Sequence, residues 1–315
     1  MTTYVLRRLL GLVPLLLLIS FAVFALVLLI PGDPARQIAG GLNAPEEQVE
    51  RVRHELGLDD PLFVQYGRWV EGIATLDLGE SLYSQRAVAT EIKDRFPITL
   101  SIAVGAVLVS LVIGVPAGIL AGTRPGSLWD RAITFGSSAG VAMPDFWLAT
   151  VLVVLFAVQR DWLPAIGYVG LTESPVEWAR HLVMPWIALG TGAAATMARQ
   201  VRGALLDVMS QDYIRTARAK GLPPRVVVGK HALKNAAIPA LTILGIQFAY
   251  ELGGTVIIET IFGIPGLGRL IYQSIGTHDL PVIQGVTLVV AFTFVLMNLL
   301  VDLAYAVVNP KVRLS

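Results

Sequence analysis

The residue types that most often carry chemistry are sparse in this chain of 315 residues. Cysteine is absent, which excludes disulfides, thiolate metal sites and cysteine nucleophiles. The histidines are scattered, with no pair three to five residues apart, so the sequence predicts no helical zinc site. They are His54, His181, His231 and His278. No Gly-x-x-x-x-Gly-Lys-Ser/Thr segment occurs, so we do not expect this chain itself to hold ATP.

Acidic residues inside apolar stretches are the exception to this sparseness. Glu251 lies within one apolar run, and Asp145 follows a proline in the middle of another. An acid at membrane depth is costly and usually faces a cavity or a partner. Two interpretations of Glu251 stay open, a translocation-path residue that meets the amino group of a solute and a helix-packing carboxyl. Asn298 and Asp302 are four residues apart on one helix face, where we expect structural pairing with a neighbouring helix.

The composition predicts that these acids are positioned by membrane helices. The chain is 55% hydrophobic and 15% charged, whereas soluble domains average about 25% charged residues. Apolar runs near the roughly 20 residues that span a bilayer occur at about 9–30, 99–122, 134–158, 182–198, 236–258 and 282–308. The first run follows Arg7-Arg8 and could be a signal peptide, but its length favours an uncleaved helix. A net charge of +1 suggests no nucleic-acid partner.

The distribution of Lys and Arg predicts how six spans would be oriented. Basic residues gather before the first run, in the short connection after the second, in residues 199–235 and in the C-terminal tail. Six spans place these segments on one side and residues 31–98, 159–181 and 259–281 on the other. Cytoplasmic loops carry the excess of Lys and Arg, so we expect both termini and residues 199–235 to be cytoplasmic.

Residues 31–98 are too polar for lipid and predict an external helical segment. One amphipathic helix is expected at about 45–58, with Asn43 as its N-cap and Asp59-Asp60-Pro61 ending it. A second is expected at about 63–76, with its apolar face made by Phe63, Tyr66, Val70 and Ile73 and with Trp69 beside that face. Whether this segment is a packed lid or a docking surface for an external partner stays open.

The basic connection at residues 199–235 predicts two short helices at a sharp bend. Ser210 can cap a helix that starts at Gln211, and Gly221 can end it in a left-handed conformation. Pro223-Pro224 then forbid continuation, and Pro224 can open the next helix, at about 225–235. One interpretation is a basic helix that rests on anionic lipid. The other is a lever whose small residues Ala217 and Ala219 allow insertion into a groove of another protein.

The same stretch resembles the cytoplasmic signature loop of binding-protein-dependent ABC transporter permeases, in their dipeptide/oligopeptide (and nickel) branch. The resemblance is carried by Gln-Asp-Tyr-Ile-Arg-Thr-Ala-Arg-Ala-Lys-Gly at 211–221, by His-Ala-Leu-Lys-Asn at 231–235 and by Pro239. The general family motif begins with Glu-Ala-Ala where this chain has Arg215-Thr216-Ala217. We interpret this departure as a mark of the peptide branch.

Further stretches resemble the same branch, in the same order along nearly the whole chain. They are Pro-Gly-Asp-Pro at 31–34, Leu-Gly-Leu-Asp-Asp-Pro-Leu-Phe-Val-Gln-Tyr at 56–66, Asp-Leu-Gly at 77–79, Glu-Thr-Ile-Phe-Gly-Ile-Pro-Gly-Leu-Gly at 259–268, Asn-Leu-Leu-Val-Asp at 298–302 and Asn-Pro at 309–310. The glycine-rich part, Gly263 to Gly268, opens no βαβ unit and is not a nucleotide-binding fingerprint; a re-entrant turn or external gate is the better interpretation.

The resemblance implies an all-α integral membrane protein with the type I ABC importer permease fold. Its six transmembrane helices would form one permease domain, 1–315, with an external helical segment at 31–98 and a coupling region at 199–235. The residues implied to couple to an ATPase are Tyr213, Arg215, Thr216, Ala217, Arg218, Ala219, Lys220, Gly221, Leu222, His231 and Asn235. Those expected at the translocation path or gate are Glu251, Gly254, Glu259, Phe262, Pro265 and Gly266.

The resemblance also implies the partners of the chain and its location in the cell. A homologous second permease in a heterodimer, two ATPase subunits that hold ATP and Mg, and an external solute-binding protein would complete an importer in the bacterial inner membrane. The permease itself would have no catalytic residue, metal or cofactor. Dipeptides, oligopeptides, nickel chelates and glutathione-like compounds stay open as solutes.

Two other classes of function compete with an ATP-driven importer. An ion-coupled secondary transporter would use acids in broken helices, and Glu251 and Asp145 hint at it. An intramembrane enzyme would need a Ser–His or His–metal arrangement on facing helices, for which the sequence offers no plausible set.

Overall fold

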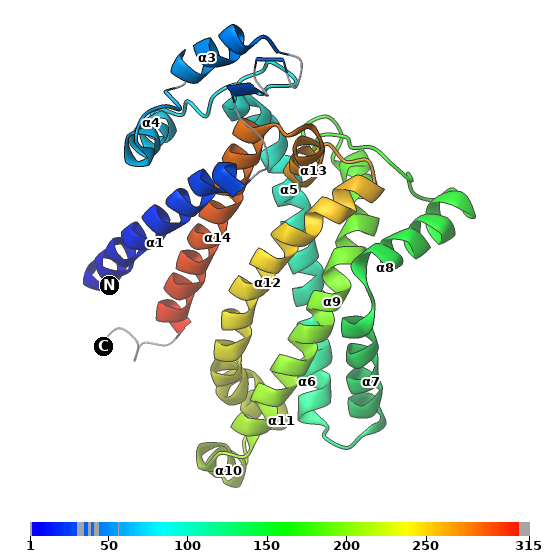
Figure 1. Ribbon diagram of the computed structural model, residues 1–315. Helices are drawn as coiled ribbons and strands as arrows, with labels where there is room; N and C mark the ends of the chain where they lie inside the picture. Colours follow the sequence, from blue (N-terminus) through cyan, green and yellow to red (C-terminus); the bar gives the residue numbers. More distant parts are fainter. Residues whose placement is uncertain (1, 30–34, 37–38, 41–43, 56, 309–315) are drawn as a thin grey trace. The chain divides into compact units, whose positions relative to one another are not determined.

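The computed structural model describes residues 2–29, 35–36, 39–40, 44–55 and 57–308. In this part of the chain, regular structure is helical apart from one bridge between Glu80 and Ala87 (Figure 1). The α-helices are α1 (Thr2–Leu29), α3 (Glu46–Glu55), α4 (Leu62–Ala74), α5 (Val88–Val109), α6 (Val115–Thr123), α7 (Leu128–Ala142), α8 (Asp145–Leu152), α9 (Pro175–Met209), α10 (Asp212–Ala219), α11 (Pro224–Val226), α12 (Leu233–Ile261), α13 (Leu267–Thr277) and α14 (Leu280–Val308). Three π-helical segments are η1 (Ser110–Gly114), η2 (Val153–Val158) and η3 (Val227–Ala232). The predicted all-helical class is confirmed.

Three continuous helices among the described residues are long and apolar enough to cross a membrane. They are Val88–Thr123, Pro224–Ile261 and Leu280–Ala304. The pair Leu128–Ala142 and Asp145–Val158 passes the same test as one span bent by 98°. A shorter apolar helix covers Leu10–Leu26. By length and composition these are three crossings, or four with the bent pair, and the count of six stays a prediction.

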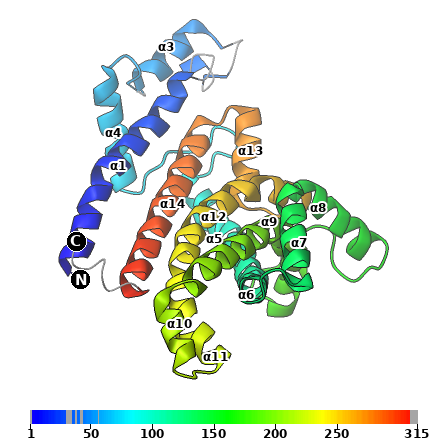
Figure 2. The ribbon, with the colours of Figure 1, turned by 90° about the horizontal axis from the view of Figure 1, so that it is seen from below.

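The chain divides into two compact units. One contains residues 1–5, 97–269 and 294–315, and the other contains residues 6–96 and 270–293. In the first unit the long helix α9 is central, because α6, α7, α8 and α12 all pack against it (Figure 2). Two apolar cores run along α9, one around Leu182 and Leu189 and the other around Val201 and Leu205.

A seam of small residues lets the helix of α5, η1 and α6 approach α9 closely. Gly114, Gly118 and Gly122 recur every four residues on one face of this helix. A methyl group added at Gly118 would lie 2.7 Å from the carbonyl oxygen of Ala198 and 2.7 Å from Cβ of Val201. Small residues bring helix backbones together in membranes, where packing rather than water exclusion holds helices to one another. The seam therefore fixes α9 in place.

The second unit contains the predicted external segment, and its helices differ in detail from expectation. The second predicted helix is α4, whose Tyr66 stacks edge-on against Phe21 of α1, with ring centroids 5.4 Å apart. The Tyr66 hydroxyl also lies 2.7 Å from Ser20 Oγ. Phe63, which was expected on the same apolar face, is 78% exposed, and the aromatic contact with Phe21 is made by Tyr66.

The first predicted helix of that segment is shorter than expected. Helix α3 ends at Glu55 rather than near Asp59, and Gly57 follows with φ +59°. The amide of Leu58 donates to the carbonyl of Arg53 at 3.0 Å, which closes the helix end. The proposed N-cap, Asn43, lies outside the described residues.

Around the basic connection, three predicted boundaries were wrong. Helix α9 continues to Met209, well past the apolar run at 182–198, so residues 199–209 belong to it. Ser210 caps the C-terminus of α9, and Gln211 instead precedes the first residue of α10. Pro224 does open a helix, but that helix continues through η3 into α12 as one 38-residue unit. The apolar run ends because Arg199, Arg202 and Asp207 are charged, but these residues do not interrupt the helix.

Candidate functional site

A bend between α7 and α8 forms one side of the candidate site. Pro144 disfavours helical geometry at the residue before it, and Met143 accordingly has an extended backbone with ψ 121°. Asp145 is the first residue of α8, and its carboxyl faces α9, since a methyl group at Gly192 would lie 3.8 Å from Oδ1. The predicted break in the third apolar run is confirmed, and it turns the chain by 98°.

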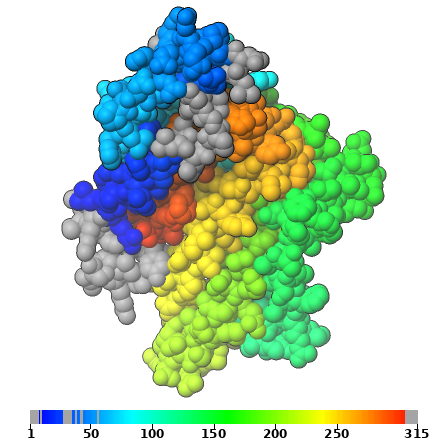
Figure 3. All heavy atoms as spheres, viewed as in Figure 1, coloured from blue at the N-terminus to red at the C-terminus, as the bar shows by residue number. Residues whose placement is uncertain are grey.

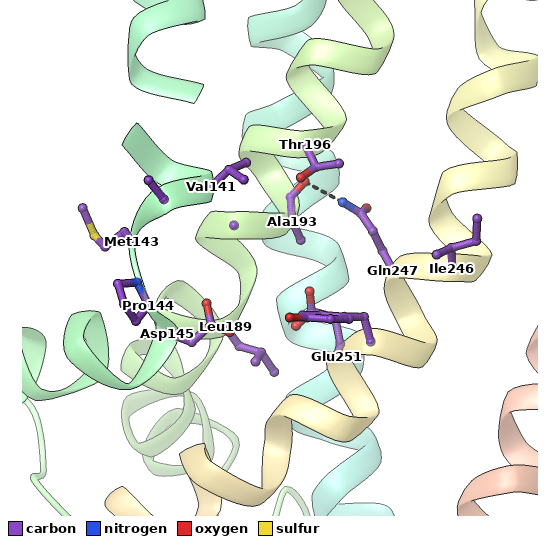
Figure 4. A pocket seen from close by; sticks show the side chains of 13 residues that line it. Val141, Met143, Pro144, Asp145, Leu189, Ala193, Thr196, Ile246, Gln247 and Glu251 are labelled. Carbon is purple, nitrogen blue, oxygen red and sulfur yellow. Dashed lines mark hydrogen bonds between the residues drawn. The ribbon is translucent and has the colours of Figure 1, made fainter. Parts of the chain in front are cut away.

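A cleft of about 520 Å³ lies between this bend, α9 and α12 (Figure 4). It is lined by Val141, Ala142, Met143, Pro144, Asp145, Leu189, Gly192, Ala193, Thr196, Ile246, Gln247, Tyr250 and Glu251. A second hollow of about 440 Å³ shares Asp145 and Tyr250 with it and reaches Gly254. Helix α12 comes close to α9 at Gly254, where an added methyl group would lie 2.8 Å from Leu189 Cδ1.

Two buried polar side chains of α12 face the cleft. Gln247 donates from Nε2 to the carbonyl of Ala193 at 2.8 Å (Figure 4). Gln247 is 7% and Glu251 3% exposed. Among the described residues, Oε1 of Gln247 and Oε2 of Glu251 have no hydrogen-bond partner. Asp145 is near enough for its charge to interact with that of Glu251. The cleft therefore contains two buried oxygen acceptors that receive no hydrogen bond from the described residues.

Glu259, expected at the path or gate, lies about two turns beyond Glu251 on α12, in a different setting. It is fully buried, and its carboxyl accepts from Thr99 Oγ1 at 2.6 Å and from the amide of Arg269 at 2.8 Å. The amide of Leu267 donates in turn to Thr99 Oγ1 at 2.7 Å. These bonds satisfy free amides at the start of α13, so Glu259 acts as a cap for that helix.

The other residues expected at the gate form the turn that Glu259 holds. Phe262 is buried in the core around Leu189, and Pro265 is exposed. At Gly266 an added methyl group would collide with the carboxyl of Glu259. The structure thus separates the expected set into two places. Glu251 and Gly254 lie at the cleft and the hollow, whereas Glu259, Phe262, Pro265 and Gly266 lie at the turn.

At the predicted coupling region, the short helix α10 packs on its own chain, at the yellow-green lower end of the surface in Figure 3. Its basic side chains are exposed. Ile214 is fully buried and Ala217 nearly so, in the core that contains Val201 and Leu205. The exposed residues of this segment are Tyr213, Arg215, Thr216, Arg218, Ala219, Lys220 and Gly221, whereas Leu222 is half-buried. The interpretation that Ala217 admits another protein was wrong, because it faces inward; Ala219 alone of the two is available.

Two contacts hold this helix and its turn. Asn235 donates from Nδ2 to the hydroxyl of Tyr213 at 2.7 Å, which joins α12 to α10. Gly221 has φ +75°, as expected for the residue that ends α10. The amide of Leu222 donates a hydrogen bond to the carbonyl of Ala217. His231 is half-buried in η3. Tyr213 and Asn235 thus contact one another, and the contact of this region with an ATPase stays a prediction.

Sequence reasoning missed two residues that the site depends on. Gln247 lies four residues before Glu251, a helical spacing that could have flagged it. Arg202 was counted only as a basic charge, but it binds Asp130 through Nε at 2.5 Å and Nη2 at 3.0 Å. This ion pair fastens the start of α7 to α9. No signal in the sequence pairs these two residues, which are 72 positions apart.

Comparisons with known proteins agree along the whole chain. The family described as the inner membrane component of binding-protein-dependent transport systems matches residues 114–314, and its N-terminal family matches residues 1–103. A peptide transport system permease protein of Brucella abortus is 42% identical over 99% of both chains. The glutathione transport system permease protein GsiC of Escherichia coli (strain K12) is likewise 42% identical over 99% of both.

Solved structures resemble the chain in fold. In an inward-facing structure of the MetNI methionine ABC transporter, one chain matches with a TM-score of 0.56 and 22% identity. The match covers 69% of this chain and 96% of that one. At this identity the likeness concerns the fold alone. With the family match over most of its length, this chain belongs to the inner-membrane permease components of binding-protein-dependent ABC transport systems.

Proposed function

We propose that this chain is one half of the channel of an ATP-driven importer that carries peptides across the bacterial inner membrane. Relatives named for peptide and glutathione transport support this solute class, since glutathione is itself a small peptide. The proposal includes six spans, with both termini and the α10 region cytoplasmic and with residues 31–98 external. The basic residues at 199–235 and in the tail support that orientation.

The observation that carries the proposal is the position of α10 between two long helices. Helix α9 has 35 residues and ends two residues before α10 begins. After the turn at Gly221, the helix that starts at Pro224 continues for 38 residues. Ile214 and Ala217 seat α10 on the core shared by α9 and α12. A force on the outward face of α10 is therefore passed directly into both long helices, as rigid-body coupling requires.

The proposed assembly explains the outward face. Arg215, Arg218 and Lys220 are exposed and lie within six residues of one another. We propose that they enter a groove of an ATPase subunit, which binds ATP and Mg. Two such subunits, a homologous second permease and an external solute-binding protein complete the importer. The exposed apolar side chains Ile246, Tyr250 and Ile257 of α12 give that second permease a surface.

Copurification from detergent tests this proposal. The tagged permease, expressed with the genes of its own transport system, is expected to retain a P-loop ATPase. Lys220→Glu reverses a charge on the proposed contact, and Gly221→Pro removes the left-handed turn, so both should release the ATPase. Lys93→Glu is the matched control, because Lys93 is an exposed lysine of α5 in the segment 31–98 that we propose to be external. Retention of the ATPase by both α10 variants would contradict the proposal.

The two acids of the cleft favour a second candidate, an ion-coupled secondary transporter. Asp145 lies at a broken helix and Glu251 is buried beside it, an arrangement that such transporters use to bind coupling ions. This candidate requires proton-driven uptake by the purified chain alone in liposomes. The importer instead requires that such uptake be absent until the ATPase, ATP and binding protein are supplied.

A further inference from the structure

The cleft between α7–α8, α9 and α12 holds more buried acceptors than the described residues satisfy. Glu251 Oε2 and Gln247 Oε1 have no hydrogen-bond partner there, and both side chains are more than nine-tenths buried. Leaving a buried polar atom unpaired costs about 1–3 kcal/mol, and more when the group is charged. A buried polar atom left unpaired in a folded protein therefore needs an explanation, and a partner from outside the chain is one.

The free oxygen of Gln247 is fixed by the rest of its own amide group. The carbonyl of Ala193 can only accept a hydrogen bond, so it must face Nε2 of Gln247, at 2.8 Å. The opposite end of the amide is then the oxygen, which remains at the cleft beside Glu251. This observation is independent of the two acids, because it concerns a neutral group held by a different bond.

The side chains that line the cleft offer no positive charge to its acids. Asp145 and Glu251 are both acidic, and among the described residues no Lys, Arg or His lines either this cleft or the adjoining hollow. Two carboxyls that share an apolar site repel one another when both are ionised. A cation from outside the chain would relieve this repulsion and satisfy the free oxygens.

The number and kind of acceptors select the type of cation. A primary ammonium carries three N–H donors, and the cleft supplies oxygen atoms from Asp145, Gln247 and Glu251. Ca²⁺ and Mg²⁺ require six or more oxygen ligands, and the described residues contain no group of three acidic, His or Cys side chains fit to hold a metal ion. The remaining wall is apolar, with Val141, Leu189 and Ile246, which suits the body of a small organic solute.

We infer that Asp145, Gln247 and Glu251 form a subsite for the protonated amino group of the solute as it passes through the permease. The cleft volume of about 520 Å³ lies within the range of small-molecule sites, roughly 300–1,000 Å³. The inference rests on the proposed function, since it assumes that the solute is a peptide with a free amino terminus. It adds the recognition chemistry and the residues that supply it.

The test uses the complete transporter in liposomes, with its binding protein and ATP. Uptake of radiolabelled tri-alanine is compared with uptake of N-acetyl-tri-alanine, which lacks the ammonium. Uptake by each variant is given as a ratio to uptake of the same peptide by the unmodified protein, so that the preference of the binding protein cancels. Glu251→Gln and Asp145→Asn remove the two acids from separate helices, and ATP hydrolysis is measured alongside. Asp161→Asn removes an exposed acid at a left-handed position and is the control.

Tri-alanine uptake at limiting peptide should fall about tenfold in Glu251→Gln, since a charge-assisted hydrogen bond contributes about 1.5–3 kcal/mol. Tri-alanine uptake should also fall in Asp145→Asn. Uptake of N-acetyl-tri-alanine by both variants, and uptake of either peptide by the Asp161→Asn control, should stay near the unmodified level. Equal losses for both peptides, or no loss for either, would overturn the inference and leave the importer intact. Absence of tri-alanine uptake by the unmodified transporter would instead reject the peptide function and the inference with it.

Discussion

Three buried acids of one compact unit meet three different environments, and the differences separate structure from function. Asp130 accepts from Arg202 and from the amide of Gly126 at 2.9 Å, so a charge of opposite sign satisfies it. Glu259 is satisfied by neutral donors, a threonine hydroxyl and a backbone amide. Glu251 has a free oxygen and an acidic neighbour. Of the three, only Glu251 requires a partner from outside the described chain.

The cap at Glu259 makes a prediction about stability. A glutamine has one acceptor oxygen where the glutamate has two, so Glu259→Gln must turn an N–H group toward either Thr99 or the amide of Arg269. One buried donor is then unsatisfied, which should lower the free energy of unfolding by about 1–3 kcal/mol. Thermal denaturation of the purified permease in detergent measures the loss.

Glu177→Gln is the control for this measurement. This variant makes the same substitution at an exposed carboxyl, which forms an ion pair with Arg180 at 2.7 Å. Exposed pairs contribute about 0–1 kcal/mol, so its midpoint should move little. Equal shifts in the two variants would show that the carboxyl of Glu259 does not cap α13.

At the scale of elements, the packing of α9 decides where the site residues lie. The glycine seam brings α6 against one side of α9, and the close approach at Gly254 brings α12 against another. Gln247 reaches the carbonyl of Ala193 only because these two helices are close. The geometry of the cleft is thus set by small residues that themselves carry no chemistry.

A matched pair of glycine substitutions tests this role of the seam. Gly118→Ala places a methyl group 2.7 Å from the carbonyl oxygen of Ala198, and backbone atoms cannot move aside easily. Overpacking of this kind costs about 1–3 kcal/mol, so the midpoint of thermal denaturation should fall. Gly136→Ala makes the same change on α7 where nothing lies within 4 Å. Its midpoint should stay or rise, since alanine favours a helix over glycine. A stable Gly118→Ala variant would show that the seam is loosely packed.

Local signals allowed the elements to be predicted better than their contacts. The break at Pro144 follows from the restriction that proline imposes on its neighbour, and the turn at Gly221 follows from its lack of Cβ. The length of α9 was underestimated because charged residues such as Arg199 and Arg202 end the apolar run without breaking the helix. The meeting of Asp145 with Glu251 joins positions 106 apart in the chain, and no local pattern encodes it.

At the scale of the whole molecule, charge distribution carries information that the helices alone do not. The described helices give three crossings, or four with the bent pair, by length and composition. The basic residues at 199–235 predict that the α10 region lies on the cytoplasmic side, where the proposed ATPase would bind. Six crossings are needed to put 31–98, 159–181 and 259–281 together on the opposite side. The proposed function and the span count therefore depend on one another.

The absence of cysteine makes this topology directly testable, because a single introduced cysteine is the only thiol in the chain. Ser84, Thr172 and Gln273 are exposed positions in the three segments expected outside, and Thr216 is exposed on α10. A membrane-impermeant maleimide applied to spheroplasts should label cysteines at the first three positions and should label Thr216→Cys only after permeabilisation. Labelling of Thr216→Cys in sealed spheroplasts would place α10 outside the cell, away from ATP, and the importer mechanism could not operate. Protection of Gln273→Cys with labelling of Ser84→Cys would instead require a different number of crossings between these two positions.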